Sequence, residues 1–450
     1  MEFKRVLYSH LKEWKTRPNR KPLIIRGVRQ VGKTTLIKNF AKKYKYHIFL
    51  NLEKSEDIQY FDNYNNIANI TDALFLSFNI PISEIKNTLL FIDEIQESPQ
   101  AIKYLRYFYE EVPDLDVIAA GSLLEFSMRQ VKSFPVGRVE YLYLYPLNFP
   151  EFLEAIGHNQ ALAALNKVPL EDYAHQTLIN LFNKYTIIGG MPEVVKAYTE
   201  TESISNLPRY YESIWGTLKN DVEKYTDTES ERRIIKHIVA CAHLYVNERI
   251  KFQNFGDSNF KSREVGEAFR NLDSAGVIKL VYPTSDIIPP VKKNLRKSPR
   301  IQFMDTGILN HSLNIQAKLL GLTDLNEAYK GAIIPHIINQ EIISLNKITN
   351  NIPAFWTREK TQASAEIDLV IPYKDMLIPV EIKSGVAGKL KSLHQFIDRA
   401  PHCYAIRIYG GNFNIEKHKT PANKKYLLMN LPYYLGTQIE KYVEMFVDNY

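Results

Sequence analysis

Near the N-terminus, eight consecutive residues have the types and spacing needed to hold a phosphate group. They fit the pattern G-x-x-x-x-G-K-[ST] in full and are Gly27, Val28, Arg29, Gln30, Val31, Gly32, Lys33 and Thr34. Glycines let the backbone fold closely around phosphates, and a helix that follows adds the positive end of its dipole. In such a loop Lys33 reaches the β- and γ-phosphates and the Thr34 hydroxyl ligates Mg²⁺. The pattern predicts that residues 27–35, including Thr35, bind ATP with Mg²⁺ and that the chain hydrolyses ATP.

Two acidic residues follow a later apolar run and complete this chemistry. The run Leu89–Ile92 leads directly into Asp93 and Glu94. A carboxylate at the C-terminal end of a buried strand is where the metal of such a site is held, and Asp93 suits that role. Glu94 is placed to orient or polarise the attacking water. The alternative for the pair is a solvated acidic strand end.

Two further residues are candidates for contact with the γ-phosphate. The apolar run Val117–Ala120 ends in Gly121 and Ser122, which puts a small hydroxyl where a sensing residue is expected. Arg138 precedes another run, and an arginine there could neutralise phosphate charge in its own chain or in a neighbouring subunit. Such arginines are worth about 10³–10⁵ in rate. The alternative is that Arg138 is an ordinary surface arginine. Arg29 occupies a variable position inside the loop and is not expected to act in catalysis.

The elements that must position these residues alternate along the chain. Strands are expected at residues 23–25, 47–52, 88–92, 116–120 and 139–145, and helical patterns separate most of them. Strands alternating with helices predict a parallel sheet covered on both faces. The phosphate loop then has the context it requires, with a strand before it and a helix after it.

Beyond Pro146 the character of the sequence changes. A helical, aromatic stretch is followed by a compact helical unit with a basic segment, and then by a new α/β segment with strands at 366–371, 377–382 and 403–409. We therefore expect four parts, at residues 1–150, 151–225, 226–315 and 325–450.

The middle of the chain has the element order of a winged helix. A helix over Ser262–Arg270 is closed by Gly276 and followed by a strand and a basic hairpin. If this part binds DNA, Arg263, Arg270 and the basic residues of 292–300 are the expected phosphate contacts. The alternative is a lid that contacts only other parts of the protein.

Near the C-terminus, a short pattern suggests a second metal site. Asp368 lies in one expected strand, and Glu381 and Lys383 lie on one face of the next. Two carboxylates from adjacent strands can converge on Mg²⁺ or Mn²⁺, and the lysine can stabilise an activated water or a phosphate. An inert sheet edge or a structural ion-pair cluster would give the same pattern.

Taken together, these residues resemble the AAA-superfamily P-loop ATPases of bacteria and archaea, and within them a group with a nuclease-like C-terminal domain. The resemblance covers nearly the whole chain. Its marks are the phosphate loop, Asp93-Glu94, Ala120-Gly121-Ser122, Gly137-Arg138-Val139, residues 146–152, 189–193 and 303–307, and Glu381-Ile382-Lys383-Ser384-Gly385.

The resemblance implies an α/β fold class with three components. These are an AAA-type P-loop domain with a parallel sheet, a helical and winged-helix middle, and a C-terminal domain similar to PD-(D/E)xK restriction endonucleases. It also implies that Glu341 adds a carboxylate to Asp368 and Glu381. The resemblance also allows a homo-oligomer in which Arg138 completes a neighbour's site, and a monomer stays open.

The amino-acid composition is compatible with these expectations and excludes few classes of function. The 450 residues carry 57 basic against 50 acidic side chains, a net charge of +7 that permits a nucleic-acid partner without demanding one. Two cysteines, Cys241 and Cys403, give no disulfide framework. Neither a signal peptide nor a membrane-spanning run is evident, so a cytoplasmic protein is expected.

Three functions remain open at this point. The leading hypothesis is an ATPase acting on or near DNA. The second is a nucleotide-dependent switch that contacts other proteins and has a silent nuclease-like domain. The third is a metal-dependent nuclease with a regulatory nucleotide site.

Overall fold

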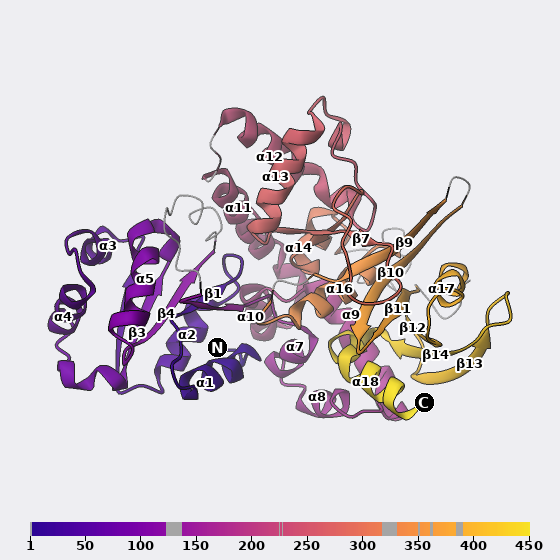
Figure 1. Ribbon diagram of the computed structural model, residues 1–450, viewed down its shortest axis with the longest axis horizontal. Coiled ribbons are helices and arrows are strands. Elements are labelled where there is room, and N and C mark those ends of the chain that lie inside the picture. The colour runs from indigo at the N-terminus through magenta and orange to yellow at the C-terminus, as the bar shows by residue number, and fades with distance from the viewer. Residues whose placement is uncertain are drawn as a thin grey trace. The chain divides into compact units, whose positions relative to one another are not determined.

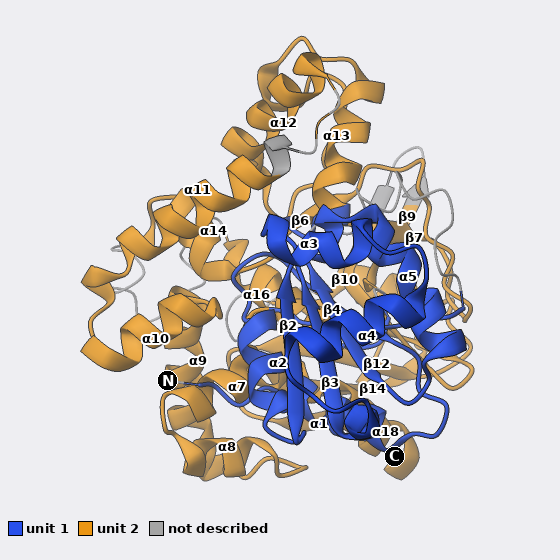
Figure 2. Cartoon of the chain, turned by 90° about the vertical axis from the view of Figure 1, so that its left-hand side faces the viewer, with its two compact units in different colours: residues 1–145, 274–277, 346–350 blue, residues 146–273, 278–345, 351–450 orange. Residues whose placement is uncertain are grey.

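The computed structural model describes residues 2–122, 137–224, 226, 228–316, 331–349, 352–360, 363–383 and 390–450 (Figure 1). The chain divides into two units, coloured separately in Figure 2. The first contains residues 1–145, 274–277 and 346–350, and the second contains residues 146–273, 278–345 and 351–450.

The apolar runs that were expected to be strands in the first unit form one parallel sheet. Its strands are β1 (Leu23–Arg26), β2 (Tyr46–Asn51), β3 (Thr88–Asp93), β4 (Asp116–Gly121) and β5 (Glu140–Tyr143). Their order is β2-β3-β4-β1-β5, and every neighbouring pair is parallel. The predicted α/β unit with a parallel sheet is confirmed. Since all five strands run the same way, their C-terminal ends share one edge of the sheet.

Helices before and between the strands contribute to the core of this unit. They are α1 (Leu7–Thr16), α2 (Lys33–Ala41), α3 (Ser55–Asp62), α4 (Ile67–Ser77) and α5 (Pro99–Glu111). Ser98 caps α5 by accepting a hydrogen bond from the Ala101 N–H, and Pro99 occupies its first turn. Apolar side chains of α3, α4 and α5 pack with those of the strands into one buried cluster. This burial fixes the sheet that carries the phosphate loop.

The second unit begins with helices and ends in a mixed α/β region. Its helices are α7 (Phe149–Ala155), α8 (Asn159–Leu165), α9 (His175–Ile188), α10 (Pro192–Thr201), α11 (Pro208–Lys224), α12 (Glu229–Cys241), α13 (Ser262–Ser274), α14 (Thr306–Ser312), α16 (Ile333–Ser344), α17 (Lys391–Ile397) and α18 (Ile439–Asn449). A short antiparallel pair, β6 (Ile278–Val281) and β8 (Arg300–Phe303), follows α13.

A seven-stranded sheet organises the C-terminal region. Its strands are β7 (Pro283–Thr284), β9 (Ala354–Lys360), β10 (Ala363–Tyr373), β11 (Met376–Ile382), β12 (Tyr404–Tyr409), β13 (Asn414–Lys419) and β14 (Lys425–Pro432), in the order β13-β14-β12-β11-β10-β9-β7. The three strands expected here from the sequence correspond to β10, β11 and β12. The edge strand β7 comes from the segment expected to be a separate winged-helix part. The four-part division of the chain stays a prediction.

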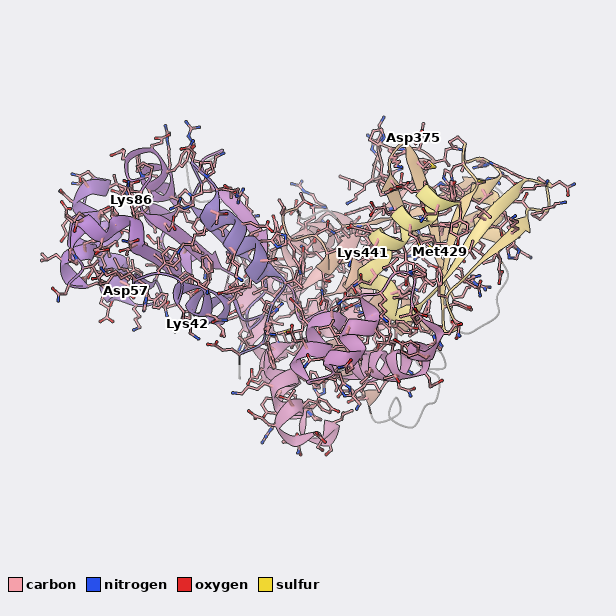
Figure 3. The ribbon with its side chains drawn as sticks, turned by 90° about the horizontal axis from the view of Figure 1, so that it is seen from below. Lys42, Asp57, Lys86, Asp375, Met429 and Lys441 are labelled. Carbon is pink, nitrogen blue, oxygen red and sulfur yellow. The ribbon has the colours of Figure 1, made fainter. Side chains whose placement is uncertain are left out.

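Strands β11 and β14 of this sheet are buried at nearly every position. Met429, in β14, is fully buried, whereas Asp375, in the turn between β10 and β11, is exposed (Figure 3). Trp356, Phe396 and Leu428 belong to a buried cluster that joins β9, α17 and β14. The core of the second unit therefore supports the strands that carry Asp368 and Glu381.

Candidate active site

The phosphate loop connects β1 to α2 and depends on two glycines. Gly27 has a φ of +155°, and a Cβ built there would lie 2.3 Å from the carbonyl oxygen of Leu144, so only glycine fits. Gly32 has a φ of +93° and precedes the first turn of α2. Because the first N–H groups of a helix have no acceptor within it, the loop presents donors at the start of α2.

Lys33 is held inside this loop. Its side chain is buried, and its Nζ donates to the carbonyl oxygens of Gly27 at 2.9 Å and of Val28 at 3.0 Å. Arg29 points elsewhere and forms an ion pair with Glu53 at 3.1 Å. The loop thus turns its lysine inward and its arginine outward.

Thr34 and Asp93 are brought into direct contact. The Thr34 hydroxyl donates to Oδ2 of Asp93 at 2.6 Å, although the two residues lie on different elements. Burial raises the pKa of the Asp93 carboxyl, and the hydrogen bond from Thr34 opposes that shift. Both groups are hard oxygen donors of the kind that Mg²⁺ prefers, so the residues present fit this ion.

Glu94 and Ser122 lie at the same edge of the sheet. Glu94 has a φ of +49°, and its Oε2 accepts a hydrogen bond from Nε2 of Gln96 at 2.5 Å. Ser122 directly follows β4, whose last residue, Gly121, lies opposite Arg26 of β1. Both residues follow the C-terminal ends of strands in this parallel sheet, and their roles in orienting water and sensing the γ-phosphate stay predictions.

Two residues of this site were not expected from the sequence. Gln96 is buried and positions the Glu94 carboxylate. Arg5 is also buried, and its Nη1 donates to the carbonyl oxygen of Val31 at 2.9 Å, which ties the N-terminal segment to the phosphate loop. No short pattern marks either residue, since each acts through a contact that depends on the fold.

Arg138 lies at the opposite edge of the sheet from the phosphate loop. It precedes β5, whose first residue, Glu140, pairs with Leu23 at the start of β1, whereas the loop follows the end of β1. Its Nε forms an ion pair with Glu110 at the end of α5, at 2.9 Å. The expectation that Arg138 acts within its own chain's site is therefore wrong. Its role in a neighbouring subunit stays a prediction.

The C-terminal residues Asp368, Glu381 and Lys383 lie close together on β10 and at the end of β11. Oδ2 of Asp368 accepts from the Ile382 N–H at 2.9 Å, and Oδ1 forms an ion pair with Arg300 at 3.2 Å. Oε1 of Glu381 forms an ion pair with Lys383 at 2.5 Å. Ser384 and Gly385, which follow Lys383 in the motif of the resemblance, lie outside the described residues.

Glu341 does not join this pair. It is buried, with Oε2 accepting from the Phe149 N–H at 2.9 Å and Oε1 from the Tyr185 hydroxyl at 2.7 Å. Within the described ranges, no three Asp, Glu, His or Cys side chains are grouped so that they could hold a metal ion. The expectation that Glu341 completes a three-carboxylate metal site is wrong, and the remaining pair, occupied by side-chain cations, does not fit a metal as it stands.

Comparison with known families adds an assignment for the first unit. Residues 19–153 match the model of an AAA domain. Residues 179–319 and 330–433 match two domains of unknown function, DUF8612 and DUF4143. Residues 19–153 are an AAA-type P-loop ATPase domain. The match spans the phosphate loop, Asp93, Glu94 and Ser122, so the site described above lies within that domain.

Three solved structures are distantly similar to the chain. No curated protein matches the chain. A Walker-type ATPase of Pyrococcus abyssi is 14% identical with a TM-score of 0.44, covering 69% of this chain and 96% of its own. The Pif1 helicase of Candida albicans is 12% identical with a TM-score of 0.22, and the match covers 39% of this chain and 45% of the helicase. The Orc1 protein of Aeropyrum pernix, solved in complex with DNA, is 12% identical with a TM-score of 0.25. The match covers 68% of this chain and 90% of the Orc1 chain. None of the helices in the described part of the chain is long and apolar enough to cross a membrane.

Proposed function

We propose that the first unit hydrolyses ATP in a Mg²⁺-dependent reaction. The observation that carries this proposal is the 2.6 Å hydrogen bond between the Thr34 hydroxyl and the Asp93 carboxylate. It joins the phosphate loop to the strand end at the point where the metal of a P-loop ATPase is held. The AAA match over residues 19–153 supports the same reaction.

Each residue then has a distinct task. The amides at the start of α2 and the Lys33 ammonium bind the β- and γ-phosphates, and Ser122 contacts the γ-phosphate. Thr34 and Asp93 would hold Mg²⁺, which neutralises negative charge on the phosphates. Glu94, fixed by Gln96, orients the attacking water and accepts its proton.

Phosphate release by the purified chain tests this proposal directly. We expect turnover with Mg²⁺, none when EDTA removes it, and recovery when Mg²⁺ or Mn²⁺ is restored, because the donors are oxygens that accept either ion. Binding of a fluorescent ATP analogue gives an independent readout of occupancy. A folded chain with no affinity for any nucleoside triphosphate contradicts the proposal.

We further propose that this ATPase acts on or near DNA. The supporting surface belongs to the strap (residues 283–300), which runs from β7 to the first residue of β8. Lys292 and Arg296 of the strap are exposed, and Asp286 holds its turn by accepting from the Lys292 N–H at 2.6 Å. Lys293 is half-buried near Asp273, and Arg300 forms ion pairs with carboxylates, so Lys292 and Arg296 are stronger phosphate candidates than these two residues.

Binding to labelled duplex DNA across a range of salt concentrations tests the strap. Each phosphate contact contributes about 0.9 to the slope of log K against log salt, so Lys292→Ala with Arg296→Ala is expected to lower that slope by about 2. The matched control is Lys417→Ala with Lys419→Ala, which removes two exposed charges from β13. If both double variants lower the slope equally, DNA binding depends only on net charge and the strap is not the DNA site.

The contacts of Asp368 and Glu381 favour a second candidate function, a nucleotide-dependent switch that contacts other proteins. Asp368 pairs with Arg300 and Glu381 with Lys383, so these two carboxylates do not form a free acidic pair for metal-dependent cleavage. The two functions separate in one experiment, ATP turnover with and without DNA at low salt. Stimulation by DNA supports action on DNA, and turnover unaffected by DNA, in a chain that does not bind the duplex, supports the switch. DNA cleavage that survives Lys33→Ala would instead support the nuclease with a regulatory nucleotide site.

A further inference from the structure

Arg5 makes two hydrogen bonds that connect the phosphate loop to the sheet of the first unit. The side chain is buried. Its Nη1 donates to the carbonyl oxygen of Val31 at 2.9 Å, and its Nη2 donates to the carbonyl oxygen of Tyr145. Val31 lies in the loop directly before Gly32, and Tyr145 lies just beyond the end of β5. One guanidinium therefore bridges the loop and the segment that leaves the sheet.

The sheet fixes the Tyr145 end of this bridge. The Leu144 N–H donates to the carbonyl oxygen of Arg26, the last residue of β1, at 2.8 Å. The carbonyl oxygen of Leu144 lies so close to Gly27 that a Cβ there would come within 2.3 Å of it. The segment after β5 thus runs beside the residue that opens the phosphate loop, and Tyr145 gives Arg5 an acceptor that is held in place.

Packing of the first helix holds the other end, the backbone of Arg5. α1 begins at Leu7, and both Leu7 and Trp14 are buried. The ring of Tyr8 packs edge-to-face on Phe40 of α2, with centroids 5.9 Å apart. The helix that follows Arg5 therefore packs on the helix that follows the phosphate loop, which restricts how far Arg5 can move from the loop.

The bond from Arg5 to Val31 determines the direction of the next N–H group. The peptide bond between Val31 and Gly32 is trans. In a planar trans peptide, the C=O and N–H groups point in opposite directions. Because Gly32 precedes the first residue of α2, its N–H has no acceptor within that helix. When Arg5 holds the Val31 carbonyl, the Gly32 N–H must point away from the guanidinium.

Arginine suits this position better than lysine does. A guanidinium presents five N–H donors in one fixed plane, so it can hold two carbonyl oxygens at a set separation. An ammonium group on a flexible stem carries the same charge but does not impose that separation. The arginine side chain therefore sets where the Val31 carbonyl lies relative to the Tyr145 carbonyl.

We propose that Arg5 is a positioning residue for nucleotide binding, which keeps the Gly32 N–H directed at a phosphate by holding the carbonyl on the other side of the same peptide. This inference rests on the proposed function of the first unit and adds a residue from outside the loop. In loops of this pattern the backbone N–H groups contact the α- and β-phosphates. ATP and ADP share these two groups, so the loss of Arg5 weakens the binding of both nucleotides by the same factor.

Titration of the full-length chain with ADP and with a non-hydrolysable ATP analogue, each with Mg²⁺, tests this inference. Arg5→Met keeps an apolar stem and removes the donors. Both dissociation constants are expected to rise by about tenfold, as when a hydrogen bond to a charged group is weakened. In steady-state turnover, KM is expected to rise by a similar factor and kcat to stay within about threefold of wild type, because the contact is made in the ground state and the transition state alike.

Two further variants separate the hydrogen bonds of Arg5 from its charge. Arg5→Lys keeps the charge without the planar fork, so its affinities are expected to lie between those of wild type and Arg5→Met. Arg17→Met is the matched control, because Arg17 is exposed after α1 and forms an ion pair with Glu140 at 2.7 Å. Its affinities should stay within about twofold of wild type, since surface ion pairs contribute little. Urea unfolding checks that each variant is folded, and if Arg5→Met is not, Arg5→Lys is compared with Arg17→Met instead.

Three results would overturn the inference. A folded Arg5→Met chain that binds both nucleotides as wild type does would show that the loop keeps its shape without Arg5. Wild-type affinity in Arg5→Lys would show that only the charge matters. A fall in kcat with unchanged KM would show that Arg5 does not act on nucleotide binding. These three outcomes leave the proposed function intact, whereas a wild-type chain that binds neither nucleotide overturns the proposed function and this inference together.

Discussion

ATP turnover by the Glu94→Gln variant is expected to fall by about 10²–10⁴ relative to the wild-type chain, the range contributed by a positioned general base. Glutamine has nearly the shape of glutamate and can still accept the hydrogen bond from Gln96 through its amide oxygen. It cannot take a proton from the attacking water. Since the hydrogen bonds of Glu94 are with Asp93 and Gln96 and not with the phosphate loop, ATP affinity is expected to stay within about threefold of wild type. Single-turnover phosphate release and analogue binding, measured on the same preparation, check both parts.

Glu97→Gln is the matched control for this variant. Glu97 lies three positions along the chain in the same short turn and is exposed. Its contact with Nε2 of Gln96 is 3.5 Å long, against 2.5 Å for the bond that holds Glu94, so its substitution removes the same charge and leaves the shorter bond in place. Its turnover should remain within about twofold of wild type, because long-range surface charges are largely screened by salt. A Glu94→Gln chain that turns over ATP normally, or a Glu97→Gln chain that is equally impaired, would remove Glu94 from the reaction.

The nucleotide site could be predicted from the sequence because its geometry follows from local patterns. A loop between a buried strand and a helix fixes the backbone around Lys33 and Thr34. A second buried strand ending in Asp93 must finish at the same edge of a parallel sheet. The 2.6 Å contact between Thr34 and Asp93 is what these two local patterns require when the strands run the same way.

The misplacement of Arg138 has an identifiable physical reason. A residue that precedes a parallel strand lies at the N-terminal edge of the sheet, whereas the phosphate loop lies at the C-terminal edge. The sequence already predicted that the strands run parallel. It therefore already implied that a residue before a strand and a loop after a strand lie at opposite ends of the sheet. The structure makes it explicit through the pairing of Glu140 with Leu23.

The errors in the second unit are of another kind, since they depend on contacts between distant segments. Glu341 accepts hydrogen bonds from Phe149 and Tyr185, which no local pattern associates with it. Arg300 was expected to contact DNA as part of a basic stretch, yet it pairs with Glu366 and Asp368. A run of like charges predicts a solvated face, but tertiary structure decides which member of the run is withdrawn from it.

The Gly190→Ala variant is expected to destabilise the second unit by about 2–4 kcal/mol, through overpacking and the weakening of buried hydrogen bonds. A Cβ at this position would lie 2.0 Å from the Leu147 carbonyl oxygen. The backbone has little room to move away. The Gly190 N–H donates to Asp305 at 2.6 Å, and its carbonyl oxygen accepts from the Leu147 N–H at 2.7 Å. Any shift that relieves the clash must lengthen these bonds.

The expected loss of stability is large because Asp305 accepts the hydrogen bond from the Gly190 N–H. This carboxylate is fully buried, burial raises its pKa to about 6, and the hydrogen bond from Gly190 opposes that shift. Asp305 also caps α14 by accepting from the Ile308 N–H at 3.1 Å. Weakening the bond from Gly190 leaves a buried carboxylate less compensated and strains the start of α14. Urea unfolding monitored by circular dichroism measures the change in the free energy of unfolding.

Gly216→Ala is the control that separates this clash from a general intolerance of alanine. Gly216 lies within α11, and a Cβ there meets no heavy atom within 4 Å. Alanine is the better helix former by up to about 1 kcal/mol, so this variant should be as stable as wild type or more stable. A Gly190→Ala chain that unfolds at the same urea concentration as wild type would mean that the segments around Leu147 and Asp305 can separate at little cost. The buried junction of these segments would then not be the constraint that its contacts indicate.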